Sequence, residues 1–341
     1  MTFNIHTFLN ILLPPAVYIG LFVTFPFVAF AKFVHWLIRS FRKENLKNHV
    51  VVITGASSGI GEELAYKYAQ RGTRLVLAAR RVEKLNKVAE KARSIGAVET
   101  LVVRCDVTLE EDCKNLIEQA VNHFGQLDHL VLNAGVANSF LLSDAPETKG
   151  FTIVMNTDFW GNVWPAYYAL PYIRARKGRF VVIASVGAWL NYPRQTFYNA
   201  SKAAVLQFFD TLRGEVRGEI EITIAMPGWI ASEMTQGKFI SAAGDSEKDQ
   251  DARDAHIGPF PVMQPGTAAE IIVWAAEHRR RYVIVPFWYM SFIPSRLWVP
   301  EIQEWFFKTF LLPRGRKPPL SKAIVQMLRG KPFYPSGLKA Q

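Results

Sequence analysis

An apolar strand followed at once by a glycine loop is the feature that most constrains the fold of this chain. Residues 50–53 read Val-Val-Val-Ile, an uninterrupted β-branched run that suits a strand buried on both faces of a parallel sheet. Small residues and glycines follow, and a helical pattern begins where they end. Such a loop presents backbone N–H groups and the positive end of a helix to a phosphate. The residues of this expected dinucleotide-binding loop are Gly55, Ser57, Ser58, Gly59, Ile60 and Gly61.

Expected strands and helices alternate along residues 48–286, which is typical of βαβ units. The sequence therefore predicts an α/β fold, a Rossmann-type doubly wound parallel sheet of seven strands. The expected strands lie at residues 50–53, 74–79, 100–107, 128–135, 179–185, 221–227 and 281–286.

The end of the second expected strand bears on the choice of cofactor. Dinucleotide folds that prefer NAD carry an acidic residue there for the ribose hydroxyls. Here the position is Ala79, followed by Arg80 and Arg81. A missing carboxylate removes repulsion of a 2′-phosphate, and Arg80 can bind that phosphate through charge-assisted hydrogen bonds. We therefore expect NADP(H) rather than NAD(H); in the alternative interpretation both arginines begin the next helix as solvated charges.

The third and fourth expected strands end in small or short polar residues. Asp106 can meet the adenine amino group or, alternatively, cap the helix that follows. Asn133, Ala134 and Gly135 allow the backbone to approach the adenosine ribose.

A tyrosine and a lysine four residues apart, Tyr198 and Lys202, share one face of an expected helix. A phenol with a pKa of about 10 is a poor proton shuttle at neutral pH, and a nearby ammonium favours the phenolate. Ser185 ends the preceding strand thirteen residues before Tyr198, where it can hydrogen-bond a substrate oxygen. Asn156 lies earlier, within an expected helix, where it otherwise reads as a helix breaker.

With the glycine loop, Asp106, the Asn-Ala-Gly and these later residues in order, residues 48–286 resemble the short-chain dehydrogenases/reductases. The resemblance implies that Tyr198 is the acid/base, that Lys202 lowers its pKa and holds the nicotinamide ribose, and that Ser185 orients the substrate oxygen. It implies that Asn156 holds a helix kink and a water that joins the lysine to solvent. The further cofactor contacts that it implies are Val107, Pro227, Gly228, Ile230 and Ser232, the last in place of the family's usual Thr.

The amino end, residues 1–31, is strongly apolar and has no Asp, Glu, Lys or Arg, a length that can cross a bilayer core of about 30 Å. A cleaved signal peptide is disfavoured because a basic n-region is missing. A single spanning helix is interrupted by Pro14, Pro15 and Pro26. The third interpretation is a bent hairpin in lipid, because the eleven-residue gap between Pro14 and Pro26 resembles the proline knob of steroleosins, the dehydrogenases of plant oil bodies.

Residues 32–47 form a basic linker whose charged side chains include Lys32, Arg39, Arg42, Lys43 and Lys47. The positive-inside tendency then predicts a cytosolic catalytic domain on a lipid droplet or the endoplasmic reticulum membrane. A lumenal domain behind a type II anchor is the alternative. His35 and Glu44 lie among these charges, and Trp36 with the alternating apolar residues suits an interfacial helix, the alternative being a solvated basic linker.

The formal net charge of +11 lies mainly in this flank and in the tail beyond Arg314, so a nucleic-acid role is disfavoured. Two cysteines, Cys105 and Cys113, give no disulfide framework, and we expect no metal.

After the sixth strand, the polar residues 233–266 are expected to form a mobile lid over the substrate, or else a solvated insertion. Residues 287–341 form an extension that is first aromatic and then basic. The aromatic part has three open roles: it covers the cleft, it dimerises, or it lies at a membrane interface. The basic tail suits contact with anionic lipid.

These features predict a membrane- or droplet-anchored NADP(H)-dependent oxidoreductase that interconverts a hydroxyl and a ketone on a lipophilic substrate. The similarity to steroleosins and 11β-hydroxysteroid dehydrogenases suggests a steroid or sterol, with a long-chain or retinoid-type alcohol as the alternative. A non-catalytic sterol-binding droplet-coat protein is a third possibility, although a scaffold has no need of all four catalytic residues. The family is often dimeric, so a homodimer is expected.

Overall fold

The computed structural model describes residues 5–41, 43–145, 147–313 and 317–328; side chains 35, 36, 38–41 and 247 are also left undescribed. Arg42, the side chains of His35, Trp36 and Arg39, and the end of the basic tail therefore lie outside the described residues. The chain divides into two units, residues 1–45 and residues 46–341. The finer domain boundaries expected above remain predictions.

The second unit is built on a seven-stranded sheet, as the sequence predicts, with every neighbouring pair parallel and the order β3-β2-β1-β4-β5-β6-β9. The order reverses between β1 and β4, so the loops after these two strands diverge and leave a crevice, the usual ligand site of open α/β sheets. The strands are β1 Val50–Thr54, β2 Arg74–Ala79, β3 Glu99–Arg104, β4 His129–Leu132, β5 Arg179–Ile183, β6 Glu221–Pro227 and β9 Tyr282–Val285.

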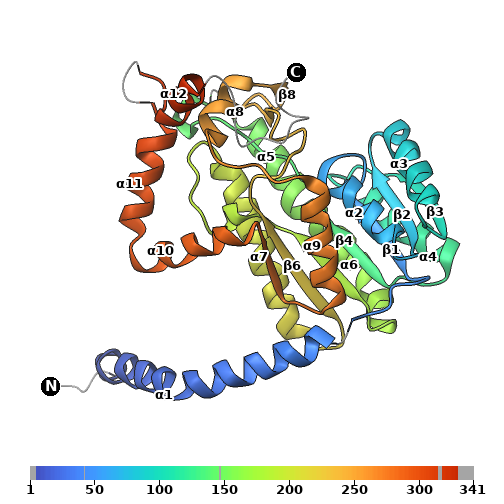
Figure 1. Cartoon of the computed structure of the whole chain (residues 1–341), viewed down its shortest axis with the longest axis horizontal. Coiled ribbons are helices and arrows are strands. Elements are labelled where there is room, and N and C mark those ends of the chain that lie inside the picture. The colour runs from blue at the N-terminus through green and yellow to red at the C-terminus, as the bar shows by residue number, and fades with distance from the viewer. Residues whose placement is uncertain (1–4, 42, 146, 314–316, 329–341) are drawn as a thin grey trace. The chain divides into compact units, whose positions relative to one another are not determined.

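Helices cover both faces of this sheet (Figure 1). Successive residues of β1 alternate between two cores: Val50 and Val52 pack on one face, Val51 and Ile53 on the other. Helices α4, α6 and α7 contribute to the first core, and α2, α3 and α9 to the second. Their bounds are α2 Gly59–Ala69, α3 Val82–Ser94, α4 Glu110–Phe124, α6 Gly161–Ala175, α7 Thr196–Glu215 and α9 Pro265–Glu277.

Shorter elements surround the carboxyl ends of the strands. They are the 3-10 turns η1 Leu142–Asp144 and η3 Val186–Ala188, helix α5 Lys149–Met155 and the π-helical turn η2 Asn156–Trp160. The expected lid contains an antiparallel hairpin, β7 Lys238–Ile240 with β8 Ser246–Lys248, and helix α8 Gln250–Ile257. It is tied to the body through an isolated bridge between Asn138 and Ile240.

The aromatic extension continues from β9 as η4 Phe287–Phe292, α10 Ile293–Trp298, α11 Pro300–Leu311 and α12 Leu320–Met327. Part of it is anchored inward: Tyr289 is 2% exposed, and Arg296 donates to the carbonyls of Ala188 and Trp189 at 3.0 Å each. Other side chains face outward, including Trp298 and Trp305, which are 78% and 63% exposed. The extension therefore covers the loop after β5, while its outer face is apolar.

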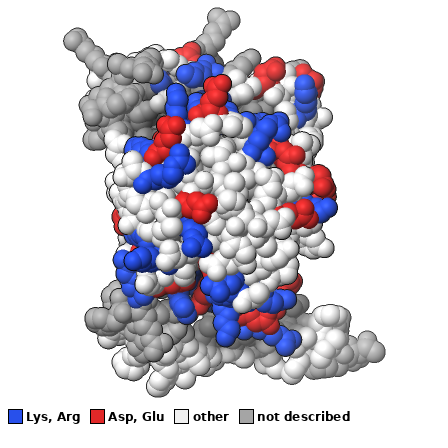
Figure 2. Space-filling view, turned by 90° about the vertical axis from the view of Figure 1, so that its right-hand side faces the viewer, with Lys and Arg blue, Asp and Glu red and all other residues white. Residues whose placement is uncertain are grey.

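Charges of both signs are interspersed on the face of the molecule shown in Figure 2, around an uncharged central area. Such a mixture is typical of an ordinary solvated protein surface.

The first unit contains helix α1, Ile5–Phe41, with Pro14, Pro15 and Pro26 inside it. Residues 5–34 are long and apolar enough to cross a membrane, the one helix in the described part of the chain that meets this criterion. Of the interpretations left open by the sequence, the structure agrees with a single helix rather than a hairpin. Each proline lacks the backbone N–H that an α-helix uses, and Figure 1 shows that α1 is not straight.

Candidate functional site

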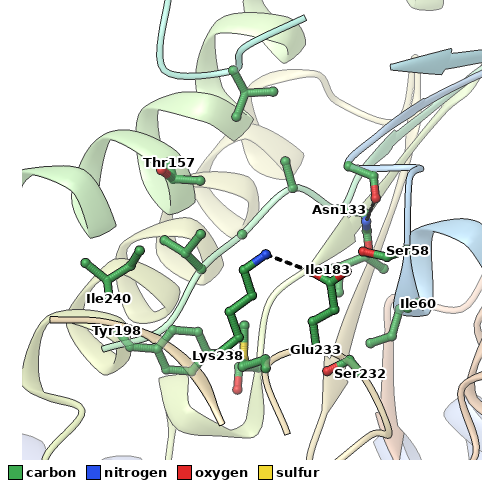
Figure 3. Close-up of a pocket in the computed structure, with 18 of the residues that line it drawn as sticks. Ser58, Ile60, Asn133, Thr157, Ile183, Tyr198, Ser232, Glu233, Lys238 and Ile240 are labelled. Atoms are coloured by element: carbon green, nitrogen blue, oxygen red, sulfur yellow. Dashed lines mark hydrogen bonds and ion pairs between the residues drawn. The ribbon is translucent and has the colours of Figure 1, made fainter. Parts of the chain in front are cut away.

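A cavity of about 800 Å³ opens at the carboxyl ends of the strands, and it brings together the glycine loop and the expected catalytic residues. In Figure 3, Ser58, Ile60 and Asn133 lie at one end of this cavity, and Thr157, Tyr198 and Ile240 at the other. The sequence-predicted residues that line it are Gly55, Ser57, Ser58, Gly59, Ile60, Arg80, Asp106, Val107, Asn133, Ala134, Gly135, Asn156, Ser185, Tyr198, Lys202, Pro227, Gly228, Ile230 and Ser232.

The glycine loop needs its glycines for two different reasons. Gly55 and Gly59 have φ of +65° and +64°, the left-handed region, and a Cβ on Gly55 would lie 2.9 Å from the Cα of Ala134. Gly61 is not among the residues that line the cavity, and its contact with the cofactor stays a prediction. A Cβ there would collide with the Asn133 amide and the Gly55 carbonyl, so Gly61 lets helix α2 pack closely on the loop.

Asn133 fixes the shape of this loop from the neighbouring strand. Its Nδ2 donates to the carbonyls of Thr54 at 3.1 Å and Gly55 at 3.2 Å, and its backbone N–H donates to the Thr54 hydroxyl at 3.0 Å. These bonds join the ends of β1 and β4, so the loop conformation depends on the switch point of the sheet.

Of the two arginines after β2, Arg81 makes the contacts with the glycine loop. Its Nη2 donates to the hydroxyls of Ser57 at 3.1 Å and Ser58 at 2.8 Å. Arg80 is 65% exposed, and its Nη1 lies 3.8 Å from Asp106 Oδ2. Both arginines line the cavity. Sequence reasoning named Arg80 alone; the double arginine after an expected strand was the available signal for Arg81.

Glu233 is a functional candidate that sequence reasoning missed. Its carboxylate accepts from Arg81 at 2.8 and 3.0 Å, from Lys84 at 2.8 Å and from Lys238 at 2.9 Å. Burial alone would raise the pKa of Glu233, but hydrogen bonds from Lys84, Lys238 and Arg81 outweigh it and lower the pKa to about 2. In Figure 3 the Lys238–Glu233 pair lies between the Ser58 end and the Tyr198 end of the cavity.

Asp106 does not cap the helix that follows it. Its Oδ1 accepts from the Thr108 N–H at 3.1 Å and from the Thr108 hydroxyl at 2.8 Å, while Leu109 is the N-cap of α4. This local turn ends β3 at Arg104, earlier than expected, and leaves Asp106 at the edge of the cavity.

Ser185 and Tyr198 lie close together in the cavity, because a Cβ on Gly187 would be 3.3 Å from both Ser185 Oγ and Tyr198 Cε1. Ser185 follows the end of β5 and caps η3, where its Oγ accepts from the Gly187 N–H at 3.0 Å. Burial and the nearby Asp158 carboxylate raise the pKa of Tyr198, and the Ser185 hydrogen bond opposes them. In the protein without a cofactor, Lys202 therefore does not lower the pKa of Tyr198 as the sequence predicted.

The reason lies in the position of Lys202. Its Nζ lies 5.7 Å from the centroid of the Tyr198 ring and 3.7 Å from Asp158 Oδ2, and both members of this ion pair are buried. Asp158 also accepts from the Val136 N–H at 2.7 Å and the Ser201 hydroxyl at 3.1 Å. Burial raises the pKa of Asp158, while these donors and Lys202 oppose the shift. The Lys202 ammonium is thus paired with the Asp158 carboxylate.

Asp158 was missed by sequence reasoning although a signal existed. It is the one charged residue between Lys149 and Arg174, a stretch whose other residues are all uncharged. Asn156 begins the π-helical turn that contains it, and the Gly161 N–H donates to the Asn156 carbonyl five residues earlier. The expected irregularity at Asn156 is present, and π-turns are frequent at functional sites.

The loop after β6 lines the cavity near the expected catalytic residues. Gly228 packs against the ring of Tyr289, where a side chain would not fit, and the Trp229 N–H donates to the Tyr289 hydroxyl at 3.4 Å. Ser232 lies beside the glycine loop, because a Cβ on Gly59 would be 3.3 Å from Ser232 Cβ. The loop therefore contacts both ends of the site.

These residues fit a nicotinamide dinucleotide. The glycine loop has the left-handed backbone and free Cβ space that a pyrophosphate at a helix N-terminus requires. A Cβ on Gly135 would lie 3.0 Å from Lys202 Nζ, so only a glycine leaves this part of the cavity open. The cavity then continues to Ser185 and Tyr198.

Comparison with known proteins agrees with this assignment. A family model described as short chain dehydrogenase matches residues 49–242. The chain is 46% identical over 304 residues to an 11-beta-hydroxysteroid dehydrogenase of Pinus massoniana, covering 89% of this chain and 85% of that one. It is 45% identical to 11-beta-hydroxysteroid dehydrogenase A of Sesamum indicum, covering 92% and 90% of the two chains.

Among solved structures, a short chain dehydrogenase/reductase from Burkholderia phymatum in complex with NAD superposes with a TM-score of 0.68 at 25% identity. The match covers 76% of this chain and 96% of that one. An alcohol dehydrogenase from Thermococcus sibiricus, complexed with 5-hydroxy-NADP, shares the fold with a TM-score of 0.58 at 24% identity, covering 70% and 96%. The fold, the cavity and these relatives lead to one conclusion: the chain belongs to the short-chain dehydrogenase/reductase family of oxidoreductases.

Proposed function

We propose that the protein is a membrane- or lipid-droplet-anchored NADP(H)-dependent oxidoreductase that interconverts a hydroxyl and a ketone on a hydroxysteroid or sterol. The catalytic part of this proposal is supported by the position of Ser185, Tyr198 and Lys202 in the same cavity as the glycine loop. The preference for NADP(H) rests on Arg80 and Arg81 after β2, where no acidic residue stands.

In the direction of oxidation, the Ser185 hydroxyl holds the substrate oxygen by a hydrogen bond. Tyr198 then accepts the proton of the substrate hydroxyl. The buried Lys202 stabilises the phenolate that results, and Asp158 keeps the lysine in position. In the direction of reduction, Tyr198 donates the proton to the carbonyl oxygen. When bound, the nicotinamide supplies the hydride chemistry. Asn156, Tyr198 and Lys202 are assigned to the proton relay.

The substrate class is argued from the apolar part of the cavity. The lining of the cavity includes the apolar or aromatic side chains of Val186, Tyr192, Trp229, Met234 and Ile240. A flat, apolar molecule with one hydroxyl or keto group suits this surface. The curated plant relatives are named for a hydroxysteroid, which favours a steroid or sterol over a long-chain alcohol.

The apolar helix α1 supports the anchor. A lipophilic substrate partitions into lipid, so an enzyme held at that surface meets a higher local concentration of it. We place the catalytic domain on the cytosolic side because basic residues follow the apolar segment.

The proposal is tested with the detergent-solubilised full chain, NADP⁺ or NAD⁺, and a panel of hydroxysteroids and long-chain alcohols. Nicotinamide reduction is followed by absorbance, beside the Tyr198→Phe variant. The proposal is supported if a steroid is turned over, if this turnover is faster with NADP⁺ than with NAD⁺, and if the Tyr198→Phe variant lacks it. Turnover of long-chain alcohols alone contradicts the substrate assignment. Cofactor binding without turnover of any compound favours the non-catalytic droplet-coat interpretation.

A further inference from the structure

The guanidinium of Arg81 has an acceptor at each of its nitrogens. Nε and Nη2 donate to the Ser57 and Ser58 hydroxyls, and Nη1 donates to both oxygens of Glu233. A phosphate that binds Arg81 must therefore displace one of these acceptors.

The three acceptors differ in how they respond to a second anion. A serine hydroxyl can rotate and donate to a phosphate oxygen, so it stays beside the anion as a ligand. A carboxylate with a lowered pKa has no proton to donate, and it repels a phosphate at hydrogen-bond distance. Glu233 is thus the acceptor that gives way.

The charges around Glu233 match this exchange. Arg81, Lys84 and Lys238 carry three positive charges against one carboxylate. A 2′-phosphate carries about −1.5 to −2 charges near neutral pH. It therefore neutralises more of the positive charge of Arg81, Lys84 and Lys238 than the Glu233 carboxylate does. NAD(H) has no such phosphate and leaves the ion pairs as they are.

Glu233 also joins separate parts of the cavity. It lies in the loop between β6 and β7, Lys84 lies on α3, and Lys238 begins β7 of the expected lid. Figure 3 shows the Lys238–Glu233 pair spanning the middle of the pocket. Release of Glu233 from Arg81 therefore loosens a tie between the cofactor end of the site and the residues that face the substrate.

We infer that Glu233 is a specificity-determining residue: it occupies the anion subsite at Arg81 and competes there with the 2′-phosphate of NADP(H). This inference rests on the proposed NADP(H) cofactor. If Glu233 competes in this way, the protein binds NADP(H) less tightly than Arg81, Lys84 and Lys238 would allow without it. The affinity for NAD(H), which has no 2′-phosphate, is not reduced by Glu233.

The test measures binding of 2′,5′-ADP and of 5′-AMP by calorimetry to the full detergent-solubilised chain. These probes carry the phosphate difference without the nicotinamide. Glu233→Gln is expected to bind 2′,5′-ADP about tenfold more tightly than the unmodified protein, with 5′-AMP unchanged. Glu233→Asp keeps the charge on a shorter side chain and is expected to show a smaller gain, which keeps the test available if Glu233→Gln is unstable.

Glu270→Gln is the matched control. Glu270 also pairs with an arginine and a lysine, Arg71 and Lys67, but it does not line the cavity. Glu270→Gln changes the net charge by the same amount as Glu233→Gln, and we expect it to leave the affinities for 2′,5′-ADP and 5′-AMP unchanged. A gain in Glu270→Gln equal to that in Glu233→Gln would reduce the effect to net charge and overturn the inference.

Arg81→Ala separates this inference from the proposed cofactor. If Arg81→Ala loses the preference for 2′,5′-ADP over 5′-AMP while Glu233→Gln and Glu233→Asp bind as the unmodified protein does, the Glu233 inference is wrong and the NADP(H) proposal stands. If none of these proteins distinguishes the two probes, the NADP(H) preference is wrong as well.

Discussion

Lys202 Nζ lies 3.7 Å from Asp158 Oδ2, and both side chains are almost completely buried. Asp158 also raises the pKa of Tyr198 through its negative charge. One carboxylate thus acts on both members of the Tyr-x-x-x-Lys pair.

We expect Asp158→Asn to move the acidic limb of the pH–rate profile for oxidation to lower pH. Tyr198 must be deprotonated to accept the substrate proton, and the variant removes the charge that raises the Tyr198 pKa. Stability should fall by about 3–5 kcal/mol, because the variant leaves the buried Lys202 without its counter-ion. The measurements are a pH–rate profile and denaturant unfolding. Ser201→Ala removes a hydrogen bond to Asp158 but keeps its charge, so an equal displacement of the profile in that control would refute the electrostatic explanation.

Tyr198→Phe should lower kcat by about 10²–10⁴-fold, because the phenol is the proposed proton donor and acceptor. The cofactor dissociation constant should change little, because the glycine loop is untouched. Steady-state kinetics and fluorescence titration measure the two effects. Tyr167→Phe, at a side chain that is 68% exposed, should retain normal activity.

Tyr289→Ala should destabilise the protein by about 3–5 kcal/mol and raise the KM for the substrate, because the ring supports Gly228 and Trp229. Tyr289→Phe keeps the ring and loses only the hydroxyl, so a loss of about 1 kcal/mol is expected. Thermal unfolding and substrate titration provide the comparison. Equal loss in the two variants would show that the hydroxyl, and not the ring, holds the loop.

His256 predicts an acid-sensitive contribution to stability. Burial, and secondarily Arg194, lower its pKa from 6.5 to about 3, and its ring packs among Tyr192, Trp229 and Phe239. Below pH 6.5 the unfolded chain binds a proton that the folded chain does not bind until about pH 3. Stability from this group is therefore complete above pH 6.5 and falls toward pH 3, by at most about 1.4 kcal/mol per pH unit.

The check compares denaturant unfolding of the unmodified protein and His256→Leu across this pH window. The variant should show a shallower loss of stability with acid. Identical slopes would mean that His256 does not contribute.

Local pattern was sufficient for the sheet and for much of the site. The alternation of strands and helices predicted all seven strands, and the thirteen-residue spacing placed Ser185 and Tyr198 in one cavity. Both signals lie in short stretches whose side-chain directions follow from secondary structure.

Contacts between distant parts of the chain were not predictable in this way. Arg81 and Glu233 are 152 residues apart, and their pairing depends on how the loops after β2 and β6 approach each other. Asp158 is aimed at Lys202 by a π-turn whose register differs from that of an α-helix. In α1, the three prolines left a hairpin and a single spanning helix both open, and the structure has one helix that contains all three.

The strand order has a further consequence for synthesis of the protein. Strands β1 to β4 form a block that can begin to fold while the remaining chain is still on the ribosome, since domains fold from the amino end as they emerge. The last strand, β9, ends at Val285, and Tyr289, which supports the loop after β6, emerges later still. A half-made chain can therefore assemble its glycine loop, but the sheet and the support of the loop after β6 are complete only when about the last sixth of the chain remains to be made.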